Sequence, residues 1–216
     1  MSCNPSEITR REAQREERRA AILAVAQQAF HDHGFGGTTM SGIAAKLGGS
    51  KGTLWAYFSS KEDLFAATID GLVAEFAPFF ELDPAKSLAD ALESYCTDFI
   101  AMMVSVPVIA LNRLVIAESP RFPALGRIFY EKAPARRQRV LAQHFEQRIA
   151  RGEMQPVDPL FAAAQLHHLC QAGLFMQILL GLAPAPTRAQ VRADAAKAAR
   201  LFVDGCGTGA RADVAR

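Results

Sequence analysis

Apolar residues recur along this chain at spacings of three and four positions, which is the period of an amphipathic helix. No stretch of β-branched and aromatic residues alternates with polar ones at period two, as a half-buried strand would require. We therefore predict an all-α fold of about nine or ten helices. Half of the 216 residues are hydrophobic, so the chain can bury a sizeable core and wholesale disorder is excluded.

Cap residues, glycines and prolines divide this pattern into separate helices. The first helix is expected over about 10–33, with Gly34 as its left-handed stop, and a short second helix follows Thr38 or Thr39. Further caps are expected at Ser50, Ser60, Ser87, Asp158 and Thr187, and the later helices over about 61–80, 88–104, 107–118, 120–151 with a kink or break at Pro134, 159–182 and 188–206.

Residues 39–58 have the layout of a helix-turn-helix, with two short helices joined by a tight turn that contains glycine. Leu54 and Phe58 of the second helix are expected to pack on the first. Successive helical residues point about 100° apart, so Gly52 and Ala56 point almost directly away from Leu54. The outermost face thus carries the smallest side chains, and its backbone can closely approach a flat partner such as a duplex.

Charge changes this picture locally. The net charge is only +2, so bulk charge predicts no polyanionic partner. From His33 to Lys61, however, the chain has three lysines and no carboxylate, although it carries 22 acidic residues in all. A surface without negative side chains suits contact with DNA phosphates, so the helix-turn-helix is expected to bind DNA.

This segment resembles the TetR family of transcriptional regulators, and the resemblance covers about 18–65. It implies an all-helical homodimer that binds a partly palindromic operator and holds a ligand in its C-terminal helices. Residues 113–118, 122–123, 125–126 and 129–130 are similar to the family's AefR-type subgroup. The matching residues of the first segment are Arg19, Ile22, Leu23, Ala26, Phe30, Gly34, Phe35, Thr38, Thr39, Ile43, Ala44, Gly48, Ser50, Lys51, Gly52, Thr53, Leu54, Tyr57, Phe58, Lys61, Glu62 and Leu64.

The resemblance implies a role for each residue of the expected DNA-binding surface. The contacts with backbone phosphates come from Thr39, Tyr57 and Lys61, and those with base edges or thymine methyl groups from Lys51, Thr53 and Trp55. Gly52 allows close approach, and Ser50 caps the helix with at most a secondary phosphate contact. The alternative is that Trp55 and Tyr57 only pack and the lysines are only solvated.

The later helices are rich in phenylalanine and methionine, most of which are expected to form the core. We expect some of them to line an apolar pocket for a small hydrophobic effector. His167 and His168 point about 100° apart, so only one can face such a pocket. Self-association is expected through the helices over 159–182 and 188–206. The candidate pocket residues are Phe76, Phe80, Phe99, Met102, Met103, Phe129, Tyr130, His168 and Phe175.

We therefore predict a ligand-responsive transcriptional regulator, most simply a repressor, that binds double-stranded DNA as a homodimer. Its expected parts are a DNA-binding domain over 10–64, a ligand-binding and dimerisation domain over 65–206 and a flexible tail over 207–216. Two alternatives stay open. One is a helical protein with a catalytic or carrier role in its apolar C-terminal cavity, and the other is a helical interaction protein whose helix-turn-helix meets protein.

No catalytic residues, cofactor or metal are expected. Gly48-x-Ser50-x-Gly52 matches a nucleophile elbow but lacks the preceding strand, and residues 31–33 (His-Asp-His) lie at a helix end where solvated side chains are ordinary. The expected location is the cytoplasm. Residues 1–19 hold five arginines, four glutamates and no apolar core of a secretory signal. The longest apolar stretch, 99–111, is too short for a membrane span.

The four cysteines, Cys3, Cys96, Cys170 and Cys206, are far apart in the sequence. They are expected to be reduced thiols, with a single long-range disulfide as the alternative.

Overall fold

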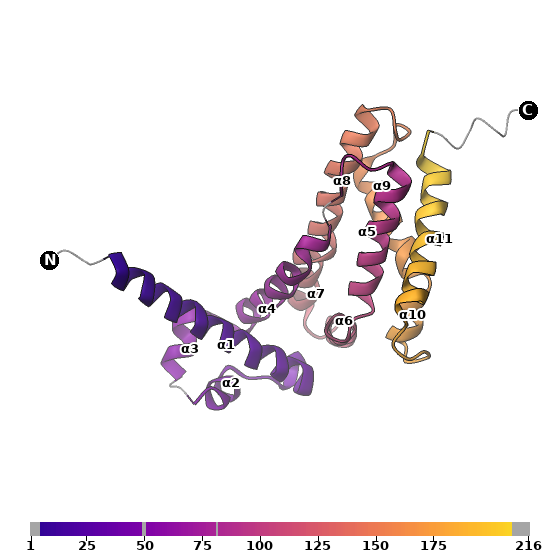
Figure 1. Ribbon diagram of the computed structural model, residues 1–216. Helices are drawn as coiled ribbons and strands as arrows, with labels where there is room; N and C mark the ends of the chain where they lie inside the picture. Colours follow the sequence, from indigo (N-terminus) through magenta and orange to yellow (C-terminus); the bar gives the residue numbers. More distant parts are fainter. Residues whose placement is uncertain (1–4, 49–50, 81, 209–216) are drawn as a thin grey trace, which may run out of the picture. The chain divides into compact units, whose positions relative to one another are not determined.

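The computed structural model describes residues 5–48, 51–80 and 82–208, and the fold over these residues is all-α (Figure 1). It contains no strand there, only an isolated bridge between Met154 and Gly207. The all-α expectation is confirmed. The elements are α1 (Pro5–Gly37), α2 (Met40–Lys46), α3 (Lys51–Tyr57), α4 (Lys61–Phe76), the 3-10 helix η1 (Ala77–Phe80), α5 (Leu88–Met103), α6 (Val106–Glu118), α7 (Pro123–Lys132), α8 (Pro134–Ala150), α9 (Pro159–Gln171), α10 (Leu174–Leu179) and α11 (Arg188–Cys206).

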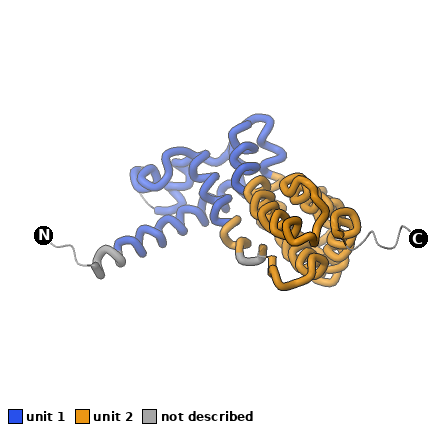
Figure 2. The backbone as a smooth tube through the Cα atoms, turned by 90° about the horizontal axis from the view of Figure 1, so that it is seen from above, with its two compact units in different colours: residues 1–72, 114–132 blue, residues 73–113, 133–216 orange. Residues whose placement is uncertain are grey.

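The chain packs as two compact units (Figure 2). Unit 1 comprises Met1–Leu72 and Leu114–Lys132, and unit 2 comprises Val73–Arg113 and Ala133–Arg216. The chain therefore passes from one unit to the other three times, inside α4, inside α6 and between α7 and α8. The expected boundary between functions after residue 64 stays a prediction, since packing alone says nothing of function.

Unit 1 has a core of aliphatic and aromatic side chains around the helix-turn-helix. Ile43 of α2 and Leu54 of α3 are 1% and 2% exposed, and Phe58 is also buried, as the spacing predicted. Phe35 stacks on Phe30 with ring centroids 5.8 Å apart and meets Phe122 at 5.3 Å. Phe35, near the end of α1, is thus in contact with two other aromatic rings.

Most of the expected helix starts are confirmed by hydrogen bonds from backbone N–H groups to the capping oxygens. Thr39 accepts the N–H of Gly42 at 3.1 Å, and Asp158 accepts that of Phe161 at 2.7 Å. Thr187 and Gln190 form a complete capping box. The other caps fit as well: Ser60 and Ser87 accept the N–H groups of Asp63 and Asp90. Ser50 lies outside the described residues.

Gly34 interrupts α1 as expected, because its φ of 69° lies in the left-handed region that glycine tolerates. The helical run nevertheless starts at Pro5 and resumes to Gly37, so it is longer at both ends than the expected 10–33.

Three expected long helices are broken. The one over 61–80 ends at Phe76 and tightens into η1, where Pro78 has no N–H for an α-helical bond. The one over 120–151 is two helices, α7 and α8, separated at Ala133 before Pro134, so the break expected at Pro134 is confirmed. The one over 159–182 is α9 and α10, separated before Leu174. There a side chain on Gly173 would collide with the Asp194 carboxylate, which accepts the Leu174 N–H at 3.1 Å.

Unit 2 is built around α5, which packs against α11 and α9, while α8 packs on α9 (Figure 1). Phe145 of α8 stacks on Phe202 of α11 with ring centroids 5.3 Å apart. No single helix in the described part of the chain has the length and hydropathy to cross a membrane, and α5 and α6 qualify only together, bent by 66° between them.

The start of the expected flexible tail is anchored. The Gly207 N–H donates to Val203 O at 2.7 Å, and the Thr208 hydroxyl donates to Gly152 O at 2.8 Å. These backbone and hydroxyl bonds need no large apolar side chain, so the composition of the tail did not reveal them. Residues 209–216 lie outside the described part of the chain.

The described cysteines are thiols. Cys96 and Cys170 are buried and free, and Cys206 is free and half-buried. A hydrogen bond with Cys96, together with burial, raises the pKa of the Cys170 thiol, so it resists ionisation. A disulfide among these three is therefore wrong, and Cys3 lies outside the described residues.

Candidate nucleic-acid interface

The outer edge of α3 is uncovered within unit 1. Gly52 and Ala56 are exposed, and the Trp55 side chain between them is 52% exposed, whereas Leu54 on the opposite face is buried. Gly48, with a φ of 63°, makes the sharp turn out of α2. The small outer side chains therefore leave the α3 backbone open to a partner, as the spacing predicted.

The predicted DNA-contacting residues of the helix-turn-helix lie at the start of α2 and along α3, and they differ in exposure. Thr39 is exposed at the start of α2, and because its oxygen accepts the Gly42 N–H, its hydroxyl proton can still point outward. Thr53 and Tyr57 of α3 are half-buried. Ser50 and the side chain of Lys51 lie outside the described part of the chain.

Lys61 has a structural role that the sequence did not indicate. Its ammonium group donates to the carbonyl oxygens of Phe35 at 2.6 Å and Thr38 at 2.9 Å, and it lies 4.3 Å from the Phe35 ring centroid. These bonds use two of its three protons. One proton stays for a phosphate, so the amine both braces the turn before α2 and keeps the capacity predicted for it.

A second brace comes from the end of α6. The carboxylate of Glu118 accepts the backbone N–H groups of Phe35 at 2.8 Å and Gly36 at 2.7 Å, across 82 to 83 positions of sequence. Together with Lys61, it satisfies donors and acceptors of the turn between α1 and α2. The start of α2 is therefore set by charged groups on other helices, which the sequence reading missed because a lone glutamate gives no local signal.

Unit 2 contains a stack of rings with an arginine beside it. The Tyr95 hydroxyl and His167 Nε2 are 2.6 Å apart, and the His167 ring lies parallel to Phe99 with centroids 4.4 Å apart. The Arg137 guanidinium lies 5.3 Å from the Phe80 ring centroid and 5.5 Å from that of Phe99. Burial lowers the pKa of Arg137, yet the guanidinium stays charged in its cation–π contacts.

The candidate pocket residues are divided between the two units and differ in burial. Phe80, Phe99, Met102, Met103 and Phe175 are buried in unit 2, and Phe76 is half-buried there. His168 is exposed, and its neighbour His167 is the buried one, because only one of two successive helical residues faces the core. Phe129 and Tyr130 belong to α7 of unit 1, with Tyr130 56% exposed, so they are not part of this stack.

The buried histidine predicts a pH dependence of stability. Burial, with smaller contributions from Arg137 and His168, lowers the pKa of His167 to about 3 from an unfolded value of 6.5. The unfolded chain then binds the extra proton between these values, so the free energy of unfolding falls as the pH drops below 6.5, by up to about 1.4 kcal/mol per pH unit. We expect melting curves from pH 6.5 to 5 to show this loss.

Replacing His167 by phenylalanine keeps a flat ring in the stack and should flatten that dependence. The matched His168→Phe variant, which changes an exposed ring, should keep it. An equal pH slope in wild type and His167→Phe would contradict a neutral buried imidazole.

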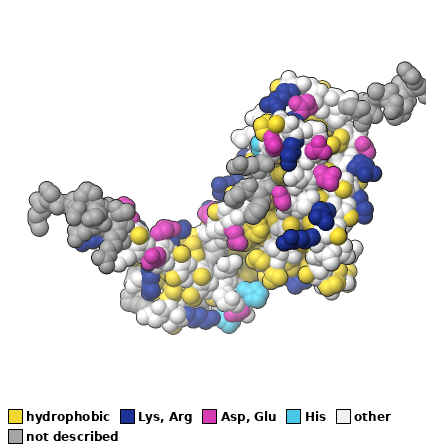
Figure 3. Space-filling model, in the orientation of Figure 1, with side chains coloured by type: hydrophobic (Ala, Val, Ile, Leu, Met, Phe, Trp, Pro, Cys, Tyr) yellow, Lys and Arg dark blue, Asp and Glu magenta, His cyan; other side chains and the backbone are white. Residues whose placement is uncertain are grey.

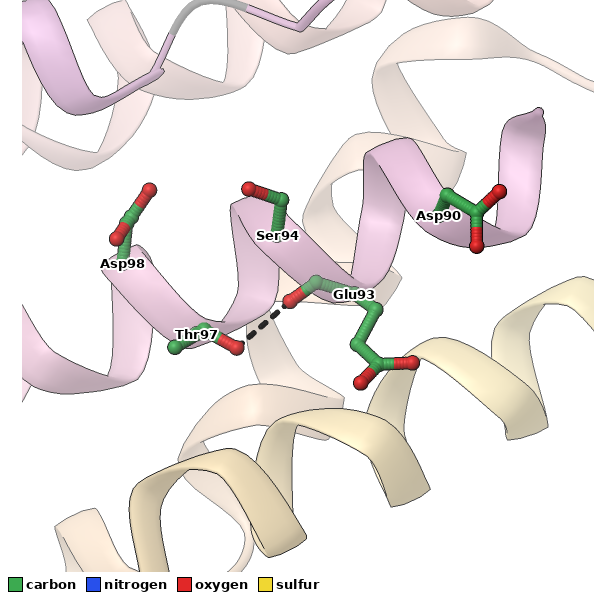
Figure 4. Close-up of a pocket in the computed structure, with 5 residues that line it drawn as sticks. All are labelled: Asp90, Glu93, Ser94, Thr97 and Asp98. Atoms are coloured by element: carbon green, nitrogen blue, oxygen red, sulfur yellow. Dashed lines mark hydrogen bonds between the residues drawn. The ribbon is translucent and has the colours of Figure 1, made fainter. Parts of the chain in front are cut away.

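The outer face of α5 carries an open hollow of about 350 Å³ (Figure 4). The Thr97 hydroxyl donates to Glu93 O at 2.8 Å, and burial raises the pKa of Asp98. This polar hollow is a different place from the expected apolar pocket. The described residues contain no group of three or more His, Cys, Asp or Glu side chains that could hold a metal ion. The residues that line the hollow are Asp90, Glu93, Ser94, Thr97 and Asp98.

Large apolar side chains are exposed on the last three helices and the loop that follows α10. In Figure 3 hydrophobic side chains gather over α10 in unit 2. Of the eleven large hydrophobic residues exposed in the described chain, six lie between 160 and 201. Exposed apolar side chains that adjoin one another mark a surface that another protein covers. The six are Leu160, Phe161, Met176, Leu180, Leu182 and Leu201, with exposed fractions from 46% to 76%.

Comparison with known proteins finds the same two parts. Residues 22–68 match the family model described as bacterial regulatory proteins of the tetR family. Residues 90–205 match the model described as the C-terminal domain of AefR-like transcriptional repressors. The second match covers more than half of the chain.

Two curated relatives are repressors of transcription. The chain is 30% identical over 143 residues to the HTH-type transcriptional repressor ComR of Escherichia coli K12, a match that covers 64% of this chain and 68% of ComR. It is also 30% identical over 102 residues to the repressor BepR of Brucella suis, covering 42% of this chain and 49% of BepR.

Two solved structures have a similar fold, and the match covers nearly the whole length of each of them. The Flavonoid-responsive Regulator FrrA is 31% identical, with a TM-score of 0.79, over 89% of this chain and 98% of FrrA. A TetR-family regulator from Mesorhizobium loti is 27% identical, with a TM-score of 0.78, over the same shares of the two chains.

Proposed function

Because this chain belongs to the TetR family of transcriptional regulators and ends in the family's AefR-like domain, we propose that it is a ligand-responsive repressor that binds a palindromic operator as a homodimer. The chain is a DNA-binding transcriptional regulator. The observation that supports our mode of binding is the bare outer edge of α3, with Gly52 and Ala56 exposed. In this mode α3 lies in the major groove of the operator.

The DNA contacts that we propose fall into two classes. Thr39, Tyr57 and Lys61 hold phosphates and set the register of the protein on the duplex. Lys51, Thr53 and Trp55 face base edges, where lysine reaches guanine O6 and N7 and the others meet a thymine methyl group. Gly52 permits the close approach, and Ser50 ends the turn as a cap.

Two lysine variants separate these classes. Lys51→Ala should weaken binding to the operator more than to random duplex, because a good base contact contributes about 1–3 kcal/mol of discrimination. Lys61→Ala should weaken both equally and also lower the melting temperature, since the carbonyl oxygens of Phe35 and Thr38 lose their donor. Anisotropy titrations on both duplexes measure the first effect and thermal denaturation the second. Equal losses on both duplexes for both variants would contradict these roles.

The homodimer is proposed to form through α9, α10 and α11. The six exposed apolar residues between 160 and 201 support this surface. In an isologous contact the same surface of each subunit meets its copy, so these side chains would be covered in both subunits. A two-fold axis there would place two copies of α3 on half-sites about 34–36 Å apart, one turn of DNA. The break before Leu174 means that this surface is made of three helices and not of the two long ones first expected.

The effector is proposed to be a small, flat, hydrophobic molecule bound in unit 2. FrrA is named for its response to flavonoids, which are planar aromatic compounds. The parallel rings of Tyr95, Phe99 and His167 and the guanidinium of Arg137 suit a flat ring with a phenolic edge. Binding there would act on DNA affinity through α4 and α6, which run from unit 2 into unit 1.

A flavonoid panel tests this part of the proposal. An active compound should lower operator affinity five- to 150-fold, the range of a coupling free energy of about 1–3 kcal/mol. Arg137→Ala should weaken this response and leave operator binding without the compound unchanged. The result is read by anisotropy titration at several compound concentrations. If no compound changes affinity, repression by this protein is not relieved by flavonoids.

We assign the chain no catalytic role, no cofactor and a place in the cytoplasm, where a bacterial operator lies. The rival is a catalytic or carrier protein that uses the interior of unit 2. Turnover of any bound compound by the purified protein would favour that rival.

A further inference from the structure

The first helix continues well beyond the bundle that carries the helix-turn-helix. In Figure 1 α1 runs past α3 toward the N-terminus. Residues 11–17 are all exposed, so nearly two turns of helix are not packed into the core of unit 1. A helix exposed all round gains nothing from core packing. This extension therefore calls for an explanation in terms of a partner.

The charges of this extension are sorted by face. Arg11, Arg15 and Arg19 follow one another at intervals of four, so they form one row. Arg15 precedes the buried Ile22 by seven residues and Arg11 precedes it by eleven, so the row continues the face that packs on the rest of unit 1. Glu17 points the opposite way, and Glu12 and Glu16 lie on one flank. The arginine row thus faces the side on which α3 lies.

Two contacts attach this row to the end of α3. The Arg15 guanidinium lies 5.9 Å from the Tyr57 ring centroid, and that of Arg19 lies 5.6 Å from the Phe58 ring centroid. Stacking on a ring leaves the edge N–H groups of a guanidinium free to donate. Tyr57 is itself a proposed phosphate contact, so Arg15 stands directly beside the DNA-facing surface and Arg11 one turn further out.

The outer two arginines are not neutralised by the described side chains. The ion pair of this segment joins Arg19 to Glu16 at 3.9 Å, and no described carboxylate lies within ion-pair distance of Arg11 or Arg15. Four residues of helix rise about 6 Å, so the two guanidinium groups can reach different phosphates.

We propose that Arg11 and Arg15 form a second DNA contact, in which the N-terminal part of α1 lies along the phosphate backbone beside the groove that α3 enters. This inference rests on the proposed function and deepens it. The contact adds affinity without base specificity, because guanidinium groups in such a row meet phosphates rather than base edges.

The salt dependence of operator binding tests the inference in the full-length protein. Two arginines from each subunit would neutralise roughly four phosphates per dimer, so R11A/R15A should make the slope of log K against log salt shallower by roughly 3.6. Its operator affinity at moderate salt should fall ten- to 100-fold. R11K/R15K should restore the slope, because lysine supplies the same charge. Alanine favours helix, and circular dichroism checks that α1 is retained.

The matched control is R136A/R139A, which removes the same charge from exposed positions on α8 and should keep the wild-type slope. An unchanged slope in R11A/R15A, an equal change in the control, or no restoration by lysine would overturn the inference. Wild-type protein that binds no duplex at any salt would instead refute the proposed function. Normal wild-type binding with an unaltered R11A/R15A slope refutes the second contact alone.

Discussion

Replacing Ala56 by glutamate is expected to lower operator affinity about 100-fold or more, because the change puts a negative charge against DNA phosphates, and like charges brought together cost several kcal/mol. It also adds bulk on the bare edge of α3. Ala56 is exposed, so neither unit 1 nor its melting temperature should be disturbed. Anisotropy titration of the operator and thermal denaturation measure the two quantities.

Ala124→Glu is the matched control for this variant. Ala124 is also an exposed helical alanine of unit 1, but it belongs to α7 and not to the helix-turn-helix. Its operator affinity should stay within a few-fold of wild type. If Ala56→Glu also bound the operator normally, the outer edge of α3 would not face DNA.

Placing aspartates at Phe161 and Leu201 is expected to separate the homodimer into monomers. Both side chains are 63% exposed in the single chain, on α9 and α11, and in the dimer each would bury a charge without a partner. A monomer reads one half-site only and loses the effective concentration of the second reading helix, which lowers operator affinity by about 10²- to 10⁴-fold. Analytical ultracentrifugation measures the mass, and anisotropy the affinity.

Val140→Asp is the control for charging an exposed apolar residue. Val140 is 43% exposed on α8, outside the proposed dimer surface, so this variant should stay dimeric and bind the operator. A dimeric F161D/L201D protein would show that self-association uses another surface.

The sequence predicted those features of the fold that depend only on residues close together in the chain. A side-chain oxygen that accepts a backbone N–H three residues on starts the helices at Thr39, at Asp158 and at the Thr187–Gln190 pair. Both partners of each bond are close in the sequence, so these starts could be predicted. Gly173 ended a helix for a different reason. It must be small because Asp194, twenty residues later, sits where its side chain would be. No local pattern carries that information.

In the candidate site, too, helical periodicity predicted some features, and others depended on residues far away in the sequence. Burial of Leu54 and exposure of Gly52 and Ala56 followed from helical periodicity. The charged braces of the turn before α2 did not, since Glu118 reaches Phe35 and Gly36 across 82 to 83 positions. For the histidine pair, periodicity showed that only one ring could be buried. The choice of His167 depended on Tyr95 and Phe99 of another helix.

Guanine methylation interference on a selected operator tests the central claim most directly, because N7 methyl groups block the major groove alone. Duplexes that the wild-type protein enriches from a random pool should carry an inverted repeat. Methylation of guanine N7 in either half should then abolish binding. Enriched duplexes without two-fold symmetry, or binding that survives methylation in both halves, would show that α3 does not read a duplex in the way described.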